Sequence, residues 1–564
     1  MAFQVSPGVQ VKEIDATSVV PAVSTSIGGF AGSFNWGPVG EITDISSEKR
    51  LAEVFGAPDN NTFKYFLQAA GFLKYGNLLK VVRVASGHLN ATAGGTGLLV
   101  KNDTHYNDNY ADGQAHDTQV AEWVAKFPGT LGNSLKVSIA TEGINNWSAY
   151  AYSENYDAAP GTSEYAASLG KGSIGDELHV TVIDQDGAIS GTAGTVLETF
   201  AFMSQGSDAK ATDGTSNYYV DVINAGSDYI RWANHSSGLS NAGSAISGLS
   251  SIAGSTSAIE DSLAGGTDDN SPTVGEIALG FDLLEDAETV DVNLLFAVPD
   301  ANGANTISND LISIAAARKD CMAFVSPPIE DTVNEAAPAV AVKAWADTLT
   351  SSSYASADST ALYVYDKYND KYRWIGASGH IAGLCAATDR TADAWFSPAG
   401  ASRGQLFGVV KLAYNPVKAD RDTLYKARVN PIVSFPGEGT LLFGDKTLLS
   451  KPSAFDRINV RRLFNTIEKA ISTAAKAQLF EFNDEFTRAQ FKNLVEPFLR
   501  DVKGRRGVTD FLVVCDTTNN TGQVIDSNSF VADIFIKPAR SINFITLNFI
   551  ATRTGVSFTE IAGS

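Results

Sequence analysis

The sequence predicts a multidomain α+β protein: a discontinuous central α/β domain with a mostly β insertion, an α+β C-terminal domain, and an extended, strand-like arm at each terminus. Three observations predict this class. Strand and helix patterns alternate on both sides of residues 86–275, that stretch is itself rich in Gly, Ser and Thr, and both chain ends alternate apolar with polar residues. At about 150 residues per domain, the 564 residues suffice for three or four domains.

The N-terminal segment, residues 1–20, has the pattern of a strand without a sheet of its own. Phe3 and Val5, and then Val9 and Val11, fall on one face of an extended chain. A lone strand leaves its backbone N–H and C=O groups unpaired, so it is stable only beside another strand edge. We therefore expect this segment to be an arm that adds a strand to a neighbouring molecule.

The central α/β domain begins in residues 21–85. A strand pattern at 24–33 is followed by a helix pattern at 46–54, for which Ser47 is a suitable N-cap. Residues 78–85 (LLKVVRVA) then read as a strong, buried strand. This order is typical of the start of an α/β unit.

Residues 86–275 interrupt that unit. They contain only six Lys and Arg residues and several short alternating segments, such as 178–183, which Asp186 and Gly187 close with a hairpin-type turn. We interpret the whole stretch as a mostly β insertion on the solvent side of the protein.

The α/β rhythm returns in residues 276–400. Strand and helix patterns alternate there, at 292–298 (strand), 308–319 (helix), 321–325 (strand), 338–349 (helix) and 362–365 (strand). Strands separated by helices of this length predict βαβ units and a largely parallel sheet. Residues 21–85 and 276–400 are therefore expected to form one discontinuous domain.

Residues 401–545 have a different pattern, which predicts a separate inner domain. Two strands flank the turn at 435–437, and two long amphipathic helices follow, with strands at 511–515 and 530–536 behind them. The apolar stripes of the two helices are Val460, Leu463, Phe464, Ile467 and Ile471 in the first, and Phe491, Leu494, Val495, Phe498 and Leu499 in the second.

The C-terminal segment, residues 546–564, mirrors the first arm. Apolar residues alternate with other residues from just before this segment and within it: Ile545, Leu547 and Phe549, then Val556 and Phe558. Arms at both ends, each in need of a foreign strand edge, indicate a building block of a polymer rather than an isolated catalyst.

Charge is divided unevenly along the chain. Residues 401–564 carry a net +6, whereas the net −21 of the whole chain leaves −27 on the rest. An acidic chain lacks the surface that neutralises phosphates, which argues against nucleic acid as a direct ligand. Basic residues do follow the first C-terminal helix: Arg457, Arg461, Arg462, Lys469 and Lys476. They predict either contact with a more acidic partner or a plain solvated face.

No pattern in the sequence predicts catalysis, a cofactor or a metal. The GxGxxG match at Gly170, Gly172 and Gly175 is followed by a strand pattern, whereas a dinucleotide site needs a helix there. The three cysteines lie far apart in the sequence, which favours buried free thiols in a reducing compartment. No apolar run approaches the ~20 residues of a membrane span, and no secretory signal is visible, so we expect synthesis in a cytoplasm without membrane insertion.

Seven segments, taken in order, resemble the tail sheath proteins of contractile-tailed bacteriophages, and most of all those of large virulent phages. They are SPGVQVKEID (6–15), NWGPVGE (35–41), FPGTLGNSLKV (127–137), SGHIAGLCAATD (378–389), FSPAG (396–400), INVRRLFNTIEKAI (458–471) and FEFND (480–484).

This resemblance implies a non-enzymatic subunit that polymerises as rings or a helix around an inner tail tube. In the family, the sheath assembles from the baseplate and contracts to drive the tube through the host envelope. Terminal arms of neighbours join a small sheet of the inner domain. The resemblance thus implies as partners the chain itself, the inner tube protein, and baseplate and tail terminator proteins. It implies a place in the virion tail after assembly in the host cytoplasm, with the basic helix facing the tube.

Three alternatives remain open at this point. The chain could be the sheath of a bacteriocin-like or extracellular injection particle, which neighbouring genes would reveal. A surface-layer or adhesin-type β protein fits the acidity and the Ser/Gly/Thr content, but it needs an export signal. An enzyme needs a convergent set of acid and base groups, which the sequence does not show.

Overall fold

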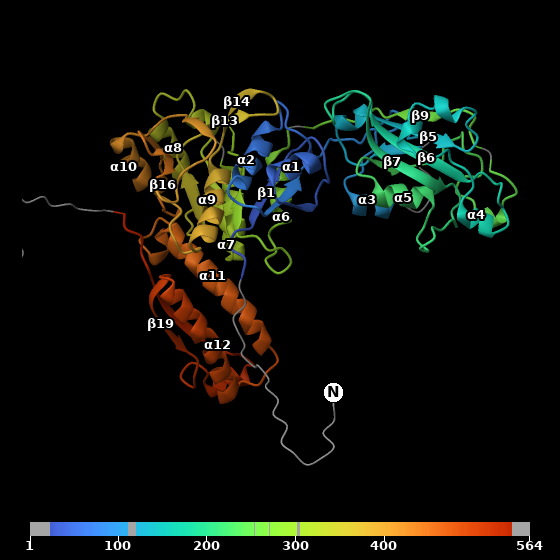
Figure 1. Ribbon diagram of the computed structural model, residues 1–564. Helices are drawn as coiled ribbons and strands as arrows, with labels where there is room; N and C mark the ends of the chain where they lie inside the picture. Colours follow the sequence, from blue (N-terminus) through green and yellow to red (C-terminus); the bar gives the residue numbers. More distant parts are fainter. Residues whose placement is uncertain (1–22, 111–119, 253, 270, 302–304, 544–564) are drawn as a thin grey trace, which may run out of the picture. The chain divides into compact units, whose positions relative to one another are not determined.

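The computed structural model describes residues 23–110, 120–252, 254–269, 271–301 and 305–543 (Figure 1). The chain divides into two compact units. The larger, here the core unit, comprises Ala22–Ala394 and Pro398–Lys469, and the smaller, here the C-terminal unit, comprises Trp395–Ser397 and the chain from Ala470 onward.

A seven-stranded sheet organises the core unit, in the order β16-β12-β11-β10-β1-β3-β2. Neighbouring strands are parallel except for β2, which pairs antiparallel with β3. The strands are β1 (Gly28–Gly32), β2 (Ile42–Ile45), β3 (Leu79–Arg83), β10 (Leu294–Phe296), β11 (Met322–Val325), β12 (Ala355–Asp358) and β16 (Val429–Asn430). The pairing of β1 with β10, at Gly28 and Leu294, joins segments that lie on either side of the insertion.

Helices pack on the sheet: α1 (Glu48–Phe55), α2 (Phe63–Leu73), α6 (Val274–Asp282), α7 (Thr306–Arg318), α8 (Pro338–Asp347), α9 (Ser378–Thr391) and α10 (Lys418–Lys426). Ser47 caps α1 as predicted, because its side chain accepts a hydrogen bond from the Arg50 amide. Phe72 of α2 stacks on Phe296 of β10, with ring centroids 5.4 Å apart. Gly28 permits this close packing, since a Cβ there would lie 2.8 Å from Phe72.

The predicted strand at 362–365 exists, but not in the parallel sheet. It is β13 (Leu362–Asp366), which pairs antiparallel with β14 (Lys371–Ile375) and β15 (Val409–Leu412) in a separate three-stranded sheet. The parallel strand of this region is β12, whose sequence is Ala-Ser-Ala-Asp. Small and polar residues have little β-propensity, so no local pattern indicates this strand.

The hairpin predicted around residues 435–437 consists of β17 (Ile432–Phe435) and β18 (Gly439–Leu442). Val429, Ile432 and Leu442 belong to the hydrophobic core of the large sheet. The two compact units therefore divide after Lys469, which differs from the predicted domain boundary at residue 400, because apolar packing holds residues 398–469 in the core unit.

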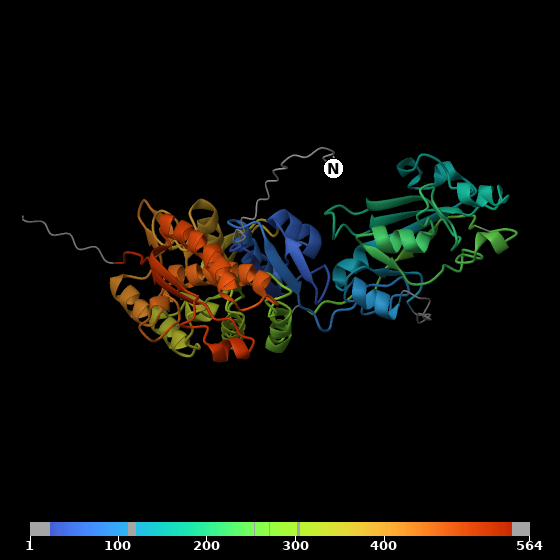
Figure 2. The same ribbon diagram turned by 90° about the horizontal axis from the view of Figure 1, so that it is seen from below.

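Residues 86–275 form a mixed, largely β region. A four-stranded antiparallel sheet has the order β7-β6-β5-β9, β4 pairs with β8, and α5 packs against β7 (Figure 1, Figure 2). The elements are α3 (Asp103–Asn109), β4 (Trp123–Ala125), β5 (Leu135–Thr141), α4 (Glu164–Ser168), β6 (Glu177–Asp184), β7 (Thr195–Ser204), α5 (Tyr219–Gly226), β8 (Ile230–Trp232) and β9 (Ile259–Ser262). A second hydrophobic core, which includes Trp123 and Val180, fills it.

In the C-terminal unit, α12 (Glu485–Gly504) packs against the strand β19 (Val508–Val514), which pairs antiparallel with β20 (Asp533–Pro538). The short helix α13 (Gly522–Asp526) lies between these strands in the sequence. Helix α11 (Ile458–Ala475) begins in the core unit and ends in the C-terminal unit. Among the helices of the described residues, none combines the length and the apolar composition that a membrane span requires. The α+β multidomain class predicted from the sequence is confirmed.

Candidate functional site

The predicted basic helix corresponds to α11. The first two of its predicted basic residues, Arg457 and Arg461, interact with other side chains of the core unit. Arg457 forms an ion pair with Asp445 at 3.2 Å. Arg461 is buried, and its guanidinium lies over the ring of Tyr354, 4.2 Å from the centroid. Both side chains thus have partners within the chain.

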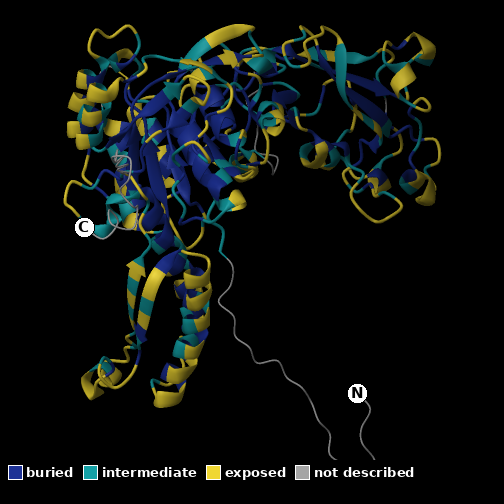
Figure 3. Cartoon of the chain, turned by 60° about the vertical axis from the view of Figure 1, so that its left-hand side comes forward, coloured by how far each residue is buried: buried dark blue, intermediate teal, exposed yellow. Residues whose placement is uncertain are grey.

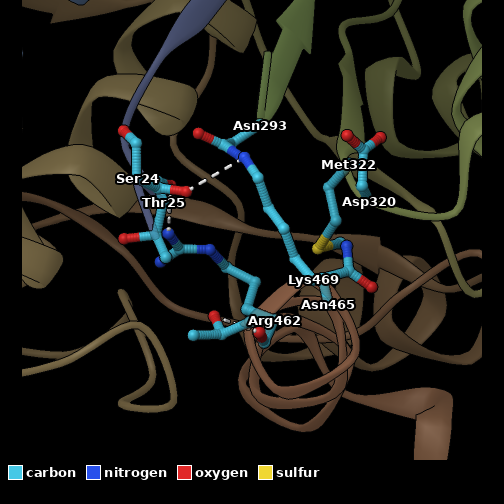
Figure 4. Close-up of a pocket in the computed structure, with 9 residues that line it drawn as sticks. Ser24, Thr25, Asn293, Asp320, Met322, Arg462, Asn465 and Lys469 are labelled. Carbon is cyan, nitrogen blue, oxygen red and sulfur yellow. Dashed lines mark hydrogen bonds between the residues drawn. The ribbon is translucent and has the colours of Figure 1, made fainter. Parts of the chain in front are cut away.

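Arg462 lies at the centre of a buried polar cluster (Figure 4). Its side chain is 4% exposed, and it forms a 2.6 Å ion pair with Asp389 of α9. It also donates to the carbonyl oxygen of Thr25 at 3.1 Å, while the Thr25 hydroxyl donates to Asp389 at 2.7 Å. Burial, the largest single cause, lowers the pKa of Arg462, but the charge interactions with Asp389 and Cys385 and the hydrogen bond to Asp389 together raise it, so the net shift is upward and the guanidinium stays charged.

Lys469, two turns further along α11, extends this cluster. It forms an ion pair with Asp291 and donates to the carbonyl oxygen of Ser24 at 3.3 Å (Figure 4). Between the side chains is a pocket of about 20 Å³, which has room for about one water molecule and none for an organic ligand. We call Ser24, Thr25, Asp389, Arg462 and Lys469 the root cluster, because Ser24 and Thr25 directly follow the predicted N-terminal arm in the sequence.

Lys476, the last of the five predicted basic residues, lies in the C-terminal unit and is exposed. It precedes a run of large apolar side chains that are also exposed: Leu479, Phe480, Phe482 and Phe486. Contact of the basic helix with an inner tube stays a prediction, and among its five residues Lys476 is the one with an exposed side chain.

The β19–β20 pair is a two-stranded ribbon. Leu512 and Phe535 face each other across it and are 57% and 59% exposed. The side chains alternate in burial along β20, as the banded colouring in Figure 3 shows. In the part of the chain that the structure describes, neither strand pairs with a third, so both outer edges present backbone N–H and C=O groups.

The predicted arm residues lie outside the described residues. They are Phe3, Val5, Val9 and Val11 at the N-terminus, and Ile545, Leu547, Phe549, Val556 and Phe558 at the C-terminus. Their role in inter-subunit pairing stays a prediction.

A joint between the central sheet and the insertion was missed by the sequence analysis. Arg83, at the end of β3, is fully buried and donates to three carbonyl oxygens: Phe34 at 2.9 Å, Gly37 at 2.7 Å and Pro128 at 2.7 Å. Burial lowers the pKa of Arg83, and Asp268 opposes that shift. The side chain thereby ties the 35–41 turn to the 127–137 loop of the insertion, two of the segments that carry the family resemblance.

The carboxyl edge of the central sheet is where open α/β sheets bind ligands. Here its polar groups bond within the protein. Asp300 accepts hydrogen bonds from the amides of Ile307 and Ser308 in the first turn of α7. Burial raises the pKa of Asp358 to about 8, and its side chain bonds to the Ser326 hydroxyl. These contacts hold helices and loops in place, and they provide no acid–base pair facing a cavity.

Family models match most of the chain outside the insertion. They are described as "Tail sheath protein Gp18 domain III N-terminal region" for residues 25–84, "Phage tail sheath protein central domain" for 278–448, and "Phage tail sheath C-terminal domain" for 450–552. The three matches follow one another along the chain without overlap.

Individual proteins match over the full length. The tail sheath protein of Vibrio phage KVP40 is 35% identical over 668 aligned positions, and that of Enterobacteria phage T4 is 33% identical over 674, each covering 99% of both chains. A sheath tail protein from Listeria innocua has a TM-score of 0.53 at 12% identity, over 92% of this chain and 96% of that one. The contracted helical sheath of the anti-feeding prophage has a TM-score of 0.50 at 14% identity, over 98% and 100%. At these identities the structures show the shared fold alone.

Proposed function

The chain belongs to the phage tail sheath family, and from that membership we propose that it joins the tail by lending both terminal arms to neighbouring copies. It is a structural subunit of a contractile tail sheath and a component of the virion tail. We further propose that it assembles in the host cytoplasm and encloses an inner tail tube between baseplate and terminator proteins. In this proposal it has no catalytic role, which the internal bonding at the carboxyl edge of the central sheet supports.

The observation that carries the proposal is the β19–β20 ribbon. Isolated two-stranded ribbons are marginal in water, and more strands stabilise them. One face of the ribbon packs on α12, so an added strand gains a buried face as well as a backbone partner. The arms have the complementary pattern, with apolar residues on one face and polar residues on the other.

Strand exchange meets the mechanical demand of contraction. Each added strand contributes several backbone hydrogen bonds, about 0.5–1.5 kcal/mol net apiece, and tethering to several neighbours at once raises the effective concentration of every contact. Compact units can then change their mutual packing while the tethers persist.

Cysteine pairs test the proposal. The apolar face of the arm is expected to turn toward α12, so its polar face, which includes Gln10, shares the outer face of the sheet with Asp510 and Lys537. In oxidised tubes, Gln10→Cys is expected to form an intermolecular disulfide with either Asp510→Cys or Lys537→Cys, measured as dimers and higher species on a non-reducing gel.

The matched control is Val9→Cys, which points to the opposite face and is expected to form no disulfide with the same partners. The native cysteines are all buried, so they do not compete. Equal cross-linking from Val9→Cys and Gln10→Cys, or cross-linking in the unassembled protein, contradicts strand exchange on this ribbon.

Lys476→Glu tests the proposed tube contact. An exposed ion pair contributes about 0.2–1 kcal/mol, so the variant is expected to polymerise normally but to bind purified tubes about two- to fivefold more weakly at low salt. Co-sedimentation measures the binding, with Arg500→Glu on α12 as the control in the same unit. Unchanged binding removes Lys476 from the contact. Charge reversal at Arg462 is unsuitable for this purpose, because it breaks a buried ion pair.

A further inference from the structure

We infer that Arg462 and Asp389 are positioning residues for the N-terminal arm: they hold Thr25 from two sides and fix the point at which the arm leaves the core unit. The inference rests on the proposed arm exchange for its purpose, while the grip itself belongs to a single chain. In this inference, the centre of the basic helix anchors the N-terminal arm of its own chain.

The grip involves two polar groups of Thr25, its backbone carbonyl oxygen and its side-chain hydroxyl. Its carbonyl oxygen accepts from Arg462 at 3.1 Å, and its hydroxyl donates to Asp389 at 2.7 Å. Arg462 and Asp389 pair with each other at 2.6 Å through the same carboxylate oxygen, and their side chains are 4% and 9% exposed. Charge-assisted hydrogen bonds shielded from water in this way are strong and directional.

The residues on either side of Thr25 are held as well. The Ser24 carbonyl accepts from Lys469, and the Ile27 amide donates to the Asn293 side chain at 3.2 Å. Backbone pairing begins at the same residue: the Ile27 carbonyl accepts from the amides of Asn293 and Leu294 at 2.9 and 3.0 Å, and the Gly28 amide then donates to the Leu78 carbonyl at 3.0 Å. Ser24 and Thr25 are therefore fixed by side chains from α11 and α9, ahead of the first backbone pairing at Ile27.

This order matters for an arm under tension. A force that pulls on residues 1–22 acts on the root cluster before it acts on β1. Without the cluster, β1 would lose its backbone hydrogen bonds one at a time, starting from its first residue. The cluster passes the pull to two helices at once, since Arg462 belongs to α11 and Asp389 to α9. A fixed exit point also limits where the arm can find a neighbour's strand edge, and so it raises the effective concentration of the correct pairing.

Thr25→Val tests the grip in the unassembled full-length protein. Valine keeps the shape of threonine and removes only the hydroxyl that donates to Asp389. Hydrogen exchange at the amides of Ile27 and Gly28 is expected to accelerate about tenfold to a hundredfold, because a hydrogen bond to a charged group is lost. Thr25→Ser keeps the hydroxyl and is expected to restore the native exchange rates.

Thr388→Val is the matched control, because Thr388 is a buried threonine of the same α9 helix whose hydroxyl donates to Leu384. It also removes one buried hydroxyl, but it is expected to leave exchange at Ile27 and Gly28 unchanged. Native exchange rates in Thr25→Val, or equal acceleration in Thr388→Val, overturn the inference.

Assembled tubes provide the second readout. Thr25→Val tubes are expected to form and then to fragment on contraction, visible as short pieces by electron microscopy, whereas Thr388→Val tubes stay intact. Intact contracted Thr25→Val tubes overturn the anchoring role. Faster exchange in Thr25→Val together with normal tubes from a protein lacking its arm shows that the grip exists and the arm exchange does not. Native exchange rates in Thr25→Val, together with failed assembly of the protein that lacks its arm, show that the arm exchange exists and the grip does not.

Discussion

A variant lacking residues 2–18 is expected to keep its fold and to form no sheath tubes. The root cluster begins at Ser24 and β1 at Gly28, so the deletion removes none of the residues that the structure places in the hydrophobic core of the central sheet. Assembly, in contrast, loses every backbone hydrogen bond that the arm makes with a neighbour. Circular dichroism and thermal unfolding are expected to match the full-length protein, while electron microscopy shows no tubes at concentrations where the full-length protein polymerises.

The side-chain phase of the arm provides the control for this deletion. Replacing the apolar set (Phe3, Val5, Val9 and Val11) by Ser is expected to prevent assembly, because the added strand then has no apolar face for α12. Replacing the opposite set (Gln4, Ser6, Gln10 and Lys12) by Ala is expected to leave it intact. Tubes from the deletion variant, or equal effects of the two substitution sets, contradict strand donation by this arm.

The parts of the fold that the sequence predicts well are those with strong local patterns. The strands β10 and β11 are continuous apolar runs, α7 lies between them and α8 follows β11, both at typical helix lengths, so βαβ order was visible without a structure. The strand β12 was not, because its four residues gain their place from backbone pairing with β11 and β16 and not from apolar side chains. Burial by neighbours, which no local pattern encodes, decides such a strand.

The candidate site shows the same limit for charges. The five basic residues along and directly beside α11 were visible, and so was the apolar stripe that includes Leu463 and Ile467, which is buried as expected. Their partners were not, since Asp389 and Asp291 lie 73 and 178 residues away from Arg462 and Lys469 in the sequence. An ion pair between distant segments leaves no spacing signal, so a buried guanidinium and a solvated one look alike until the packing is known.

Arg83 was also not predicted from the sequence, because it is buried by neighbouring segments and its partners lie far away along the chain. Its replacement is expected to have a large effect on stability. Arg83→Met keeps an apolar stem of similar length and leaves the carbonyl groups of Phe34, Gly37 and Pro128 without their charged donor. An unsatisfied buried acceptor costs about 1–3 kcal/mol, so the variant is expected to lose at least about 3 kcal/mol. For a unit as large as the core unit that corresponds to a fall of about 3 °C in Tm, measured by calorimetry.

The same strand contains a matched control for this prediction. Lys80 of β3 forms a 2.8 Å ion pair with Asp44, but Asp44 is mostly exposed, so Lys80→Met is expected to change Tm by little. Arg83→Lys keeps the charge, yet a single ammonium cannot serve three carbonyl groups that a planar guanidinium reaches from three nitrogens, so an intermediate Tm is expected. Since the Gly37 and Pro128 carbonyls belong to the turn and to the insertion, Arg83→Met is also expected to speed hydrogen exchange in the 127–137 loop. Equal Tm values for Arg83→Met and Lys80→Met contradict the assignment of Arg83 as the joint between sheet and insertion.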